Sequence, residues 1–146
     1  MEKAIAEAQK ANACGEVPIG AVIVKDGKII AKGYNKRQTT KNALHHAELT
    51  AIDKACKKIG DWRLENCQMY VTLEPCPMCA GAIIGSRIEK VFFAAKDKTA
   101  EDGLFEKIIS SPRLNHTCTS EQLTEYEDAC AKMLTTFFKS KRKSTK

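Results

Sequence analysis

Apolar residues recur every three or four positions in several segments of the chain, and this spacing predicts helices that bury one face. The segments with this pattern are residues 2–13, 42–58, 76–86 and, more weakly, 104–109. Gly15 and Gly60 follow the first two segments, and glycine is common where a helix ends. The pattern therefore predicts at least four helices before the end of the chain.

Shorter runs rich in β-branched and aromatic residues predict strands between these helices. They are residues 21–24, 29–31, 68–73 and 90–95. Lys25-Asp26-Gly27-Lys28 separates the first two runs, and Asp-Gly between such runs favours a β-hairpin. Glu74-Pro75 ends the third run, so we expect the chain to leave the sheet there.

The C-terminal part of the chain predicts one more helix. Thr119-Ser120-Glu121-Gln122 has the T-x-x-Q form of a capping box. Apolar residues then repeat at three or four positions: Leu123, Tyr126, Cys130, Leu134 and Phe137 or Phe138. This pattern predicts an amphipathic terminal helix of about 18 to 20 residues.

Helices that alternate with strands predict a three-layer α/β domain, with a hairpin at the start of its sheet. The 146 residues are enough for one domain with its own core. We expect residues 1–138 to form this domain. No apolar run approaches the ~20 residues of a membrane-spanning helix, and the N-terminus has no signal-peptide pattern. These features favour a cytoplasmic protein without a membrane partner.

The net charge of +6 comes mostly from the end of the chain. The last eight residues, KSKRKSTK, hold five of the 24 Lys and Arg residues, which leaves 19 basic residues against 18 acidic ones. Residues 139–146 are therefore predicted to be a basic tail. Such a tail is either a solvated terminus or a contact for a polyanion such as RNA.

The chain has seven cysteines, and only two of them have a spacing that carries chemistry. Cys76 and Cys79 form a C-x-x-C pair, which can be a redox couple, half of a structural zinc site or two ligands of a catalytic metal. The others stand singly, and we expect them to be packing residues or surface thiols. They are Cys14, Cys56, Cys67, Cys118 and Cys130.

Histidine supplies the missing ligand for a metal site. His45 and His46 lie near the start of the helix that precedes the C-x-x-C pair, so either could approach Cys76 and Cys79 at one edge of the sheet. One histidine and two thiolates leave a fourth position open, as catalytic zinc sites do, whereas structural sites are closed by four protein ligands. Glu48 follows His46 by two residues and could transfer protons beside the metal without binding it. We therefore take His46 as the ligand and expect His45 to have a flanking role.

The pattern H-A-E … P-C-P-M-C has the H-x-E … P-C-x-x-C form found in zinc-dependent deaminases of nucleosides and bases. The chain resembles one family of these enzymes, the bacterial tRNA adenosine deaminases of the cytidine deaminase superfamily, over roughly residues 1–140. The segments that carry the resemblance are EVPIGAVIV, GYN, HAE, VTLEPCPMCAGAII, SRI before a V-F-F strand, LNH and a final Phe-Phe-Lys.

The resemblance implies hydrolytic deamination of adenosine to inosine at the wobble position of a tRNA anticodon. It makes His46, Cys76 and Cys79 the ligands of one Zn²⁺ per subunit, and Glu48 the proton shuttle. It also implies a cytidine-deaminase-like fold with a mixed sheet of about five strands. A homodimer that binds the anticodon stem-loop of tRNA is expected on the same basis.

The family also implies contacts to the nucleotides. Asn35 corresponds to the residue that holds the target nucleoside, and the backbone of Ala47 to a contact with the base. Four further residues correspond to positions around the flipped base: Asp97, Asn115, Phe137 and Phe138. Without the resemblance, these residues would be read as turn, loop and core positions.

Some features depart from the family and keep alternatives open. The family usually has a glycine- and serine-rich turn after Asp97, whereas this chain has Glu101 and Asp102 near the expected path of the RNA. The P-C-P-M-C form also occurs in guanine and cytosine deaminases, so a deaminase of a free base or nucleoside is the main alternative. A thiol–disulfide protein would not need His46 or Glu48, and an inactive RNA-binding zinc module would not need Glu48.

Overall fold

One mixed β-sheet forms the centre of the described residues 1–145 of this computed structural model. Its strand order is β2-β1-β3-β4-β5. β1 pairs antiparallel with both β2 and β3, whereas β4 runs parallel to both β3 and β5. The strands are β1 (Gly20–Lys25), β2 (Lys28–Tyr34), β3 (Cys67–Leu73), β4 (Lys90–Ala95) and β5 (Thr119–Gln122).

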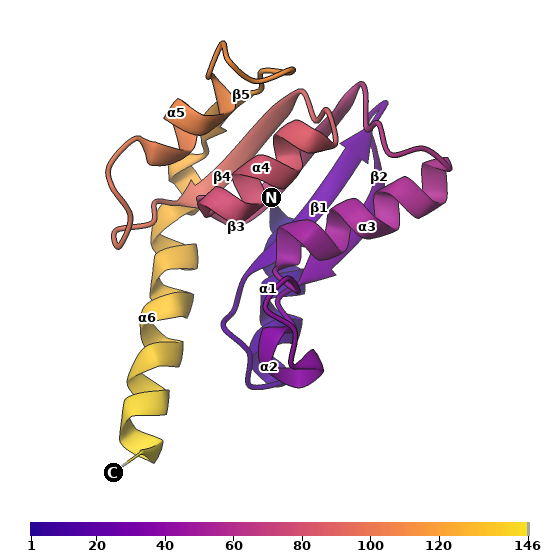
Figure 1. Cartoon of the computed structure of the whole chain (residues 1–146). Coiled ribbons are helices and arrows are strands. Elements are labelled where there is room, and N and C mark those ends of the chain that lie inside the picture. The colour runs from indigo at the N-terminus through magenta and orange to yellow at the C-terminus, as the bar shows by residue number, and fades with distance from the viewer. Residues whose placement is uncertain (146) are drawn as a thin grey trace.

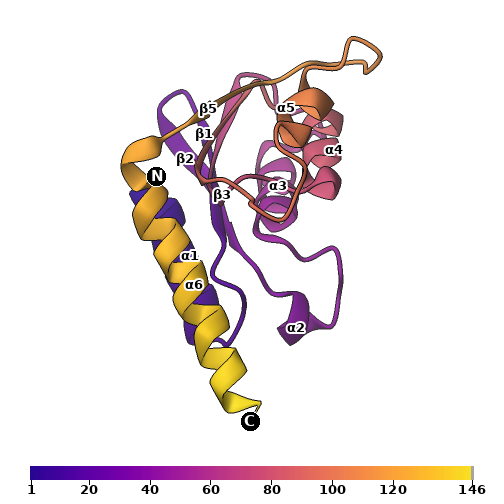
Figure 2. The same ribbon diagram turned by 90° about the vertical axis from the view of Figure 1, so that its left-hand side faces the viewer.

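Helices cover both faces of the sheet (Figures 1 and 2). α1 (Glu2–Ala13) and α6 (Glu127–Ser144) lie on one face. α3 (Ala47–Ile59), α4 (Pro77–Gly85) and α5 (Leu104–Ile109) lie on the other. Two short elements complete the description, α2 (Arg37–Thr40) and the 3₁₀ turn η1 (Thr124–Tyr126). The predicted three-layer α/β fold with a hairpin at the start of a five-stranded mixed sheet is confirmed.

The larger hydrophobic core lies between the sheet and the α3, α4 and α5 layer. Alternate residues of β3, including Met69 and Val71, are buried there against residues such as Ile83 of α4. A smaller cluster lies under α6, where Cys130 packs on Ala94 and Ala95, and Ile5 of α1 adjoins it. The larger core therefore packs against α3 and α4, the two helices whose starts carry the predicted metal ligands.

A glycine in β2 allows α3 to lie directly on the strand. A Cβ atom added at Gly33 would stand 2.5 Å from the carbonyl oxygen of Ala47 and 2.7 Å from the nitrogen of Ala51. Real Cβ atoms do not approach backbone atoms this closely, so any other residue would push the helix away. Gly33 thus sets the position of the first turn of α3.

Two of the predicted element boundaries are wrong. The helix expected from residue 42 begins only at Ala47, because residues 42–45 form a turn that places the side chain of His46 at the helix start. Thr119–Gln122 is not a capping box but the edge strand β5, which pairs in parallel with Lys90–Phe93. A short, polar edge strand has no apolar alternation, so its pairing partner on β4 decides its structure.

The terminal helix has 18 residues, in agreement with the expected length, but it starts and ends later than predicted. α6 continues through residue 138 to Ser144, so the basic residues from Lys139 to Lys143 are helical. The last residue of the predicted tail, Lys146, lies outside the described residues. The separate role of residues 139–146 stays a prediction. Within residues 1–145, no helix is both long and apolar enough to cross a membrane.

Candidate active site

The starts of α3 and α4 bring three ligand atoms together. His46 is the N-cap residue of α3, Cys76 is the N-cap residue of α4, and Cys79 lies in the first turn of α4. The Nδ1 atom of His46 is 3.6 Å from Sγ of Cys76 and 3.5 Å from Sγ of Cys79. All three ligand atoms lie within 4.8 Å of one another. The structure therefore assembles the residues that the sequence pattern singled out.

These distances fit a zinc ion. Tetrahedral coordination with Zn–S near 2.3 Å and Zn–N near 2.0 Å requires a nitrogen–sulfur separation of about 3.5 Å. The two separations from His46 agree with this value. One imidazole and two thiolates are ordinary zinc donors, and a set of three protein ligands is typical of catalytic sites. The donor set thus fits a catalytic zinc ion.

Hydrogen bonds among the three groups favour a thiolate. The thiol of Cys79 donates to Cys76 and, together with His46 and against the effect of burial, lowers the pKa of Cys76 to about 4. The same hydrogen bond, with burial, raises the pKa of Cys79. The hydrogen bond to Cys76 also raises the pKa of His46. The lowered pKa of Cys76 favours its thiolate form, which is the form that binds metal ions.

Glu48 lies beside this cluster without belonging to it. It is in the first turn of α3, and only 4% of its surface is exposed. Burial raises the pKa of its carboxyl group, partly offset by a hydrogen bond to its own backbone and by one from Cys79. A buried carboxyl group with a raised pKa, beside a candidate metal site, is suited to accept and return a proton.

A cavity of about 220 Å³ opens beside His46 and brings predicted substrate residues to the site. The other residues around it come from the segment before β1, the segment after β2, α2, α3 and α6: Val17, Ile19, Asn35, Arg37, Ala47 and Phe138. Asn35, Ala47 and Phe138 thus line the same cavity as His46, and their contacts with a substrate stay a prediction. The structure also adds Arg37, which the sequence analysis did not select.

The side chain of Asn35 is buried and held in place. Its amide nitrogen donates to the carbonyl oxygen of Val17 at 3.4 Å, and its amide oxygen accepts from the backbone N–H of Arg37 at 3.1 Å. A fixed polar group at the wall of a small cavity can orient a ligand.

A second cavity, of about 390 Å³, adjoins the first and contains Asp97. The two cavities share Val17 and Phe138. Phe138 is 47% exposed, whereas Phe137 is buried and packs edge-on against it with ring centroids 5.4 Å apart. Phe137 therefore supports Phe138 and does not line either cavity.

The loop that carries Asp97 is tied to the loop that carries the cysteines. Glu74, two residues before Cys76, accepts a hydrogen bond from the backbone N–H of Asp97 at 3.1 Å. Asp97 in turn accepts from the backbone and the hydroxyl group of Thr99 at 2.9 and 2.6 Å. The ligand loop and the groove beside it are thus positioned together.

Asn115 lies away from the site. It is exposed in the segment between α5 and β5, and the adjacent His116 contacts the carbonyl oxygen of Ile88, just before β4, at 2.8 Å. The ligand cluster is near the opposite ends of β3 and β4, so the structure does not bring Asn115 to it. Its predicted contact with the substrate stays a prediction.

His45 faces away from the ligand cluster, into the turn before α3. Its ring nitrogens lie 2.7 Å from the hydroxyl oxygen of Thr40 and 3.2 Å from the amide nitrogen of Asn42. These contacts agree with the flanking role expected for it.

The sequence analysis missed Glu16, a buried carboxylate behind the site. Only 1% of its surface is exposed, and it accepts hydrogen bonds from the backbone N–H groups of Gln38 and Thr39 at 3.1 and 2.7 Å. Burial alone would raise its pKa, but these hydrogen bonds outweigh burial and lower the pKa. Glu16 thus holds the short helix α2, which follows Asn35 and carries Arg37. Its partners lie more than 20 residues away, so no local pattern identifies it.

Comparisons with known proteins agree with this geometry. Residues 1–142 match the family model of the MafB19-like deaminases. The whole chain aligns with 91% of the tRNA-specific adenosine deaminase of Bacillus subtilis (strain 168) at 49% identity.

Two solved structures resemble the chain to different degrees. A structure from a study of A-to-I editing by tRNA:A34 deaminases at the wobble position superimposes with a TM-score of 0.85, at 37% identity over 92% of this chain and 97% of the other. The guanine deaminase of Bacillus subtilis superimposes with a TM-score of 0.64, at 42% identity over 84% of this chain and 82% of the other. The structural match is thus closer to the first.

Proposed function

Since the chain belongs to the MafB19-like deaminase family, among the tRNA-specific adenosine deaminases, we propose that it converts adenosine to inosine at the wobble position of tRNA anticodons. The reaction consumes water and releases ammonia. The observation that carries the proposal is the His46, Cys76 and Cys79 cluster at the wall of a small cavity, with Glu48 buried beside it.

His46, Cys76 and Cys79 would hold the zinc ion. When bound, zinc supplies Lewis-acid chemistry that lowers the pKa of a water molecule to about 7 and so makes a nucleophile available at neutral pH. The family relationship and the donor distances both support this cofactor, at one ion per chain.

Glu48 would carry the protons of the reaction. Its carboxylate takes a proton from the attacking water and delivers it to N1 of the adenine ring, and a second transfer goes to the amino group that leaves as ammonia. Burial raises the pKa of Glu48, so its carboxylate is a stronger proton acceptor than that of an exposed glutamate.

The cavity and the groove beside it would hold the flipped base and its neighbours. An anticodon loop is a suitable substrate because its bases are already unpaired and can leave the stack at little cost. Asn35 and the backbone of Ala47 line the cavity next to the ligands, so they would orient the base. The exposed ring of Phe138 offers a stacking surface for a neighbouring base, with Asp97 beyond it.

The last turns of α6 would contact the tRNA backbone. Phe138, at the wall of both cavities, is followed on the same helix by four basic residues, all exposed: Lys139, Lys141, Arg142 and Lys143. Cations at the rim of a nucleic-acid site contribute affinity that depends on salt concentration.

We also propose a homodimer, located in the cytoplasm, where tRNA functions. Residues Pro77–Gly85 of α4 contain no charged side chain, and Pro77, Gly81 and Gly85 are exposed along one side of the helix. An uncharged exposed helix face supports self-association. Light scattering on the purified protein measures the assembly directly.

The alternative is a zinc-dependent deaminase of a free base or nucleoside, such as guanine, cytosine or cytidine. The 42% identity to a guanine deaminase favours it, but the lower TM-score and the exposed aromatic and basic residues of α6 favour a nucleic acid. A free base is too small to use those residues.

One experiment separates the two. Purified protein is assayed for zinc, for inosine formation in an anticodon stem-loop, and for ammonia release from guanine, cytosine, cytidine and adenosine. We expect about one zinc per chain and inosine in the stem-loop. Rapid ammonia release from guanine without inosine formation would establish the alternative, and full activity without metal would refute both.

A further inference from the structure

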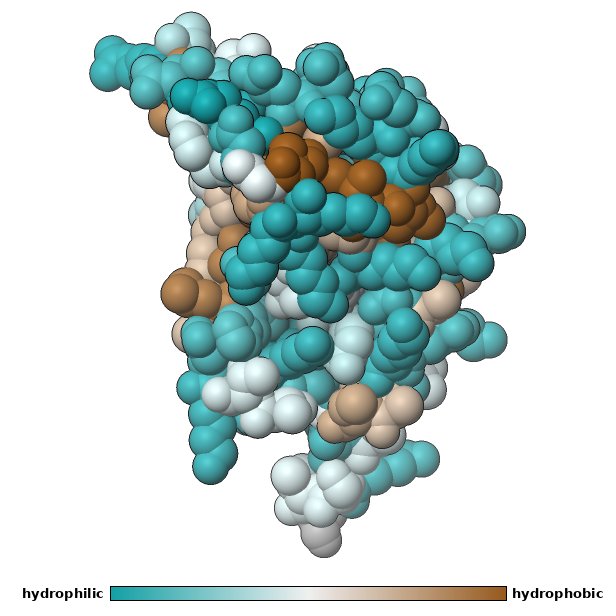
Figure 3. Space-filling view, turned by 90° about the vertical axis from the view of Figure 1, so that its right-hand side faces the viewer, coloured by the Kyte–Doolittle hydropathy of each residue, from teal (hydrophilic) through white to brown (hydrophobic). Residues whose placement is uncertain are grey.

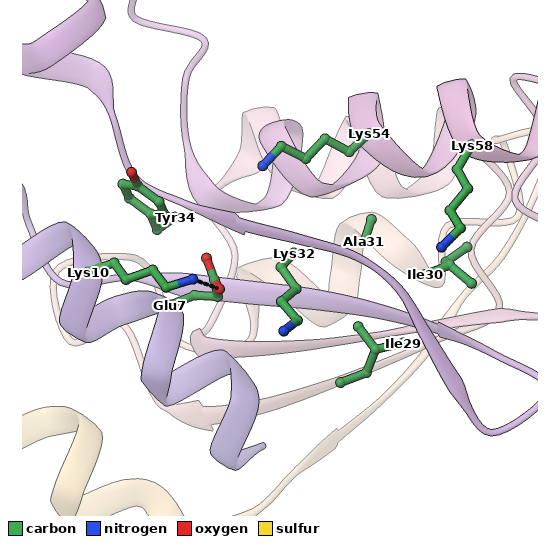
Figure 4. Close-up of a pocket in the computed structure, with 9 residues that line it drawn as sticks. All are labelled: Glu7, Lys10, Ile29, Ile30, Ala31, Lys32, Tyr34, Lys54 and Lys58. Carbon is green, nitrogen blue, oxygen red and sulfur yellow. Dashed lines mark hydrogen bonds and ion pairs between the residues drawn. The ribbon is translucent and has the colours of Figure 1, made fainter.

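A cleft of about 550 Å³, separate from the two cavities at the candidate active site, lies along the edge strand β2 between α1 and α3 (Figure 4). β2 is the first strand of the sheet, and within residues 1–145 no strand pairs with its outer edge. The residues of the cleft that matter here are Lys10, Ile29, Lys32, Tyr34, Lys54 and Lys58. None of them belongs to the cavities at the candidate active site.

The cleft is positively charged. Four lysines line it, and its one acidic residue, Glu7, is buried and already paired with Lys10 at 2.8 Å. Across the described part of the chain, no carboxylate forms an ion pair with Lys32, Lys54 or Lys58. Three ammonium groups thus remain available for an anion.

The floor of the cleft is apolar and ends at an aromatic ring. Ile29 is 37% exposed, and Figure 3 shows a hydrophobic patch on this side of the molecule, surrounded by hydrophilic residues. At the other end of the strand, the ammonium group of Lys36 lies 4.7 Å from the ring centre of Tyr34. Cations that flank apolar and aromatic surface are the combination that single-stranded nucleic acids bind.

The cleft ends where the candidate active site begins. Tyr34 lines the cleft and the next residue, Asn35, lines the cavity beside His46. Successive residues of an extended chain point to opposite sides, so Tyr34 can face the cleft while Asn35 faces the cavity at the candidate active site. The strand runs from there for seven residues, a length of about 20 Å. A polyanion that enters the active site could continue along this strand.

We propose that the β2 cleft binds the phosphate backbone of the tRNA next to the anticodon nucleotides that enter the active site. This inference rests on the proposed function. Lysine on an edge strand also prevents strand-to-strand aggregation, which would account for Lys32. It does not account for Lys54 and Lys58, which extend from α3 (Figure 4).

Charge reversal tests the inference. Lys32→Glu and Lys58→Glu are compared with Lys132→Glu, an exposed residue on α6 outside the cleft and outside both active-site cavities. The Kd for tRNA is measured as a function of salt concentration. Each cleft variant should weaken binding several-fold and reduce the slope of log K against log salt by about 1, the loss expected for one phosphate contact. The Lys132 variant should leave both unchanged.

The activity readout uses saturating tRNA. The cleft residues lie outside both cavities at the candidate active site, so the cleft variants should form inosine with the wild-type kcat and differ from the wild type in KM. Unchanged tRNA affinity and salt slope in both cleft variants would overturn the inference. Absence of inosine with wild-type protein would instead refute the proposed function. If a charge reversal prevents folding, judged by circular dichroism, Lys32→Gln and Lys58→Gln provide the same comparison with half the charge change.

Discussion

Two buried glutamates occupy opposite roles around the candidate site. Glu48 has its carboxyl group beside the ligand cluster, and burial raises its pKa. Glu16 lies behind the site, and its hydrogen bonds to Gln38 and Thr39 lower its pKa. The first is suited to exchange protons, whereas the second is held as an anion that fixes the short helix α2.

Glu48→Gln should abolish catalysis without loss of the metal. The substitution keeps the shape of the side chain but removes its capacity to carry a proton, so we expect kcat to fall by about 10²- to 10⁴-fold. Zinc content should stay near one per chain, because the described ligand cluster does not include Glu48. His46→Gln is the comparison and should lose zinc. A Glu48→Gln enzyme with the wild-type rate would contradict the assigned role.

Glu16→Gln should destabilise the protein in a pH-dependent way. The buried, charged acceptor of two backbone N–H groups is lost, at a cost of about 1–3 kcal/mol in the free energy of unfolding. Because folding lowers the pKa of Glu16, its contribution is full above the usual value of 4.5 and is lost as the pH falls below it. The difference between wild type and variant should therefore be large at pH 7 and shrink toward pH 3.

Urea unfolding at these pH values measures this difference. The exposed Glu65→Gln is a suitable control and should change stability by less than about 0.5 kcal/mol. An equally large difference at pH 3 and pH 7 would show that charge is not the cause.

Sequence analysis identified the site residues that belong to a short motif with a fixed spacing. His46, Cys76 and Cys79 follow a spacing set by helix starts, so their meeting could be expected. Glu16 and Arg37 depend on contacts between distant segments, which spacing does not encode. Asn115 was selected by resemblance alone, and it lies in the segment between α5 and β5, near the start of β4 and away from the ligand cluster.

At the scale of elements, the close fit of α3 on β2 positions the histidine ligand. His46 is at the start of α3, and the same turn of helix packs on Gly33. A shift of α3 would move His46 relative to the two cysteines of α4. The ligand distances therefore depend on a residue that does not touch the metal site.

Gly33→Ala tests this dependence. The added methyl group would overlap backbone atoms of α3, and we expect a loss of about 1–3 kcal/mol in stability, together with weaker zinc binding. Lys3→Ala, an exposed change on α1, is the control, because Lys3 lies far from α3 and from the ligand cluster. Chemical denaturation and competition with a zinc chelator measure the two effects. Equal zinc affinity in Gly33→Ala and wild type would refute the coupling.

Removal of residues 139–146 should weaken tRNA binding and flatten its salt dependence, because it removes the basic end of α6. The helix before residue 139 keeps its packing through Cys130 and Phe137, so the fold should persist. Replacement of Lys139, Lys141, Arg142 and Lys143 by glutamine keeps the length and should act in the same way. Unchanged affinity in both proteins would show that this end of the helix is only solvated.

The elements themselves were predictable where one face is buried. Helical and alternating patterns identified α1, α4, β1 and β4. β5 was missed because four polar residues at the sheet edge form a strand only when β4 is present as a template. The boundary of α3 was misplaced because the turn before it also contains residues that helices accept.

At the scale of the whole molecule, the two faces of the sheet have different roles. The α3, α4 and α5 face holds the larger core and the metal ligands. The α1 and α6 face holds a smaller cluster and supplies Phe138 to the cavities. The candidate active site therefore draws its chemistry from one layer and part of its substrate surface from the other.

The strand order also bears on the order of folding. β1 and β2 are joined by a tight turn, so their pairing closes a very short loop. β1 pairs on its other side with β3, where Ala21 meets Val71, and this contact must close a loop of about 50 residues, which is slower. His46 meets Cys76 and Cys79 across sequence separations of 30 and 33 residues. We expect the hairpin to form early during synthesis, and the chain to acquire its metal only after the Cys79 segment has emerged and β3 has joined β1.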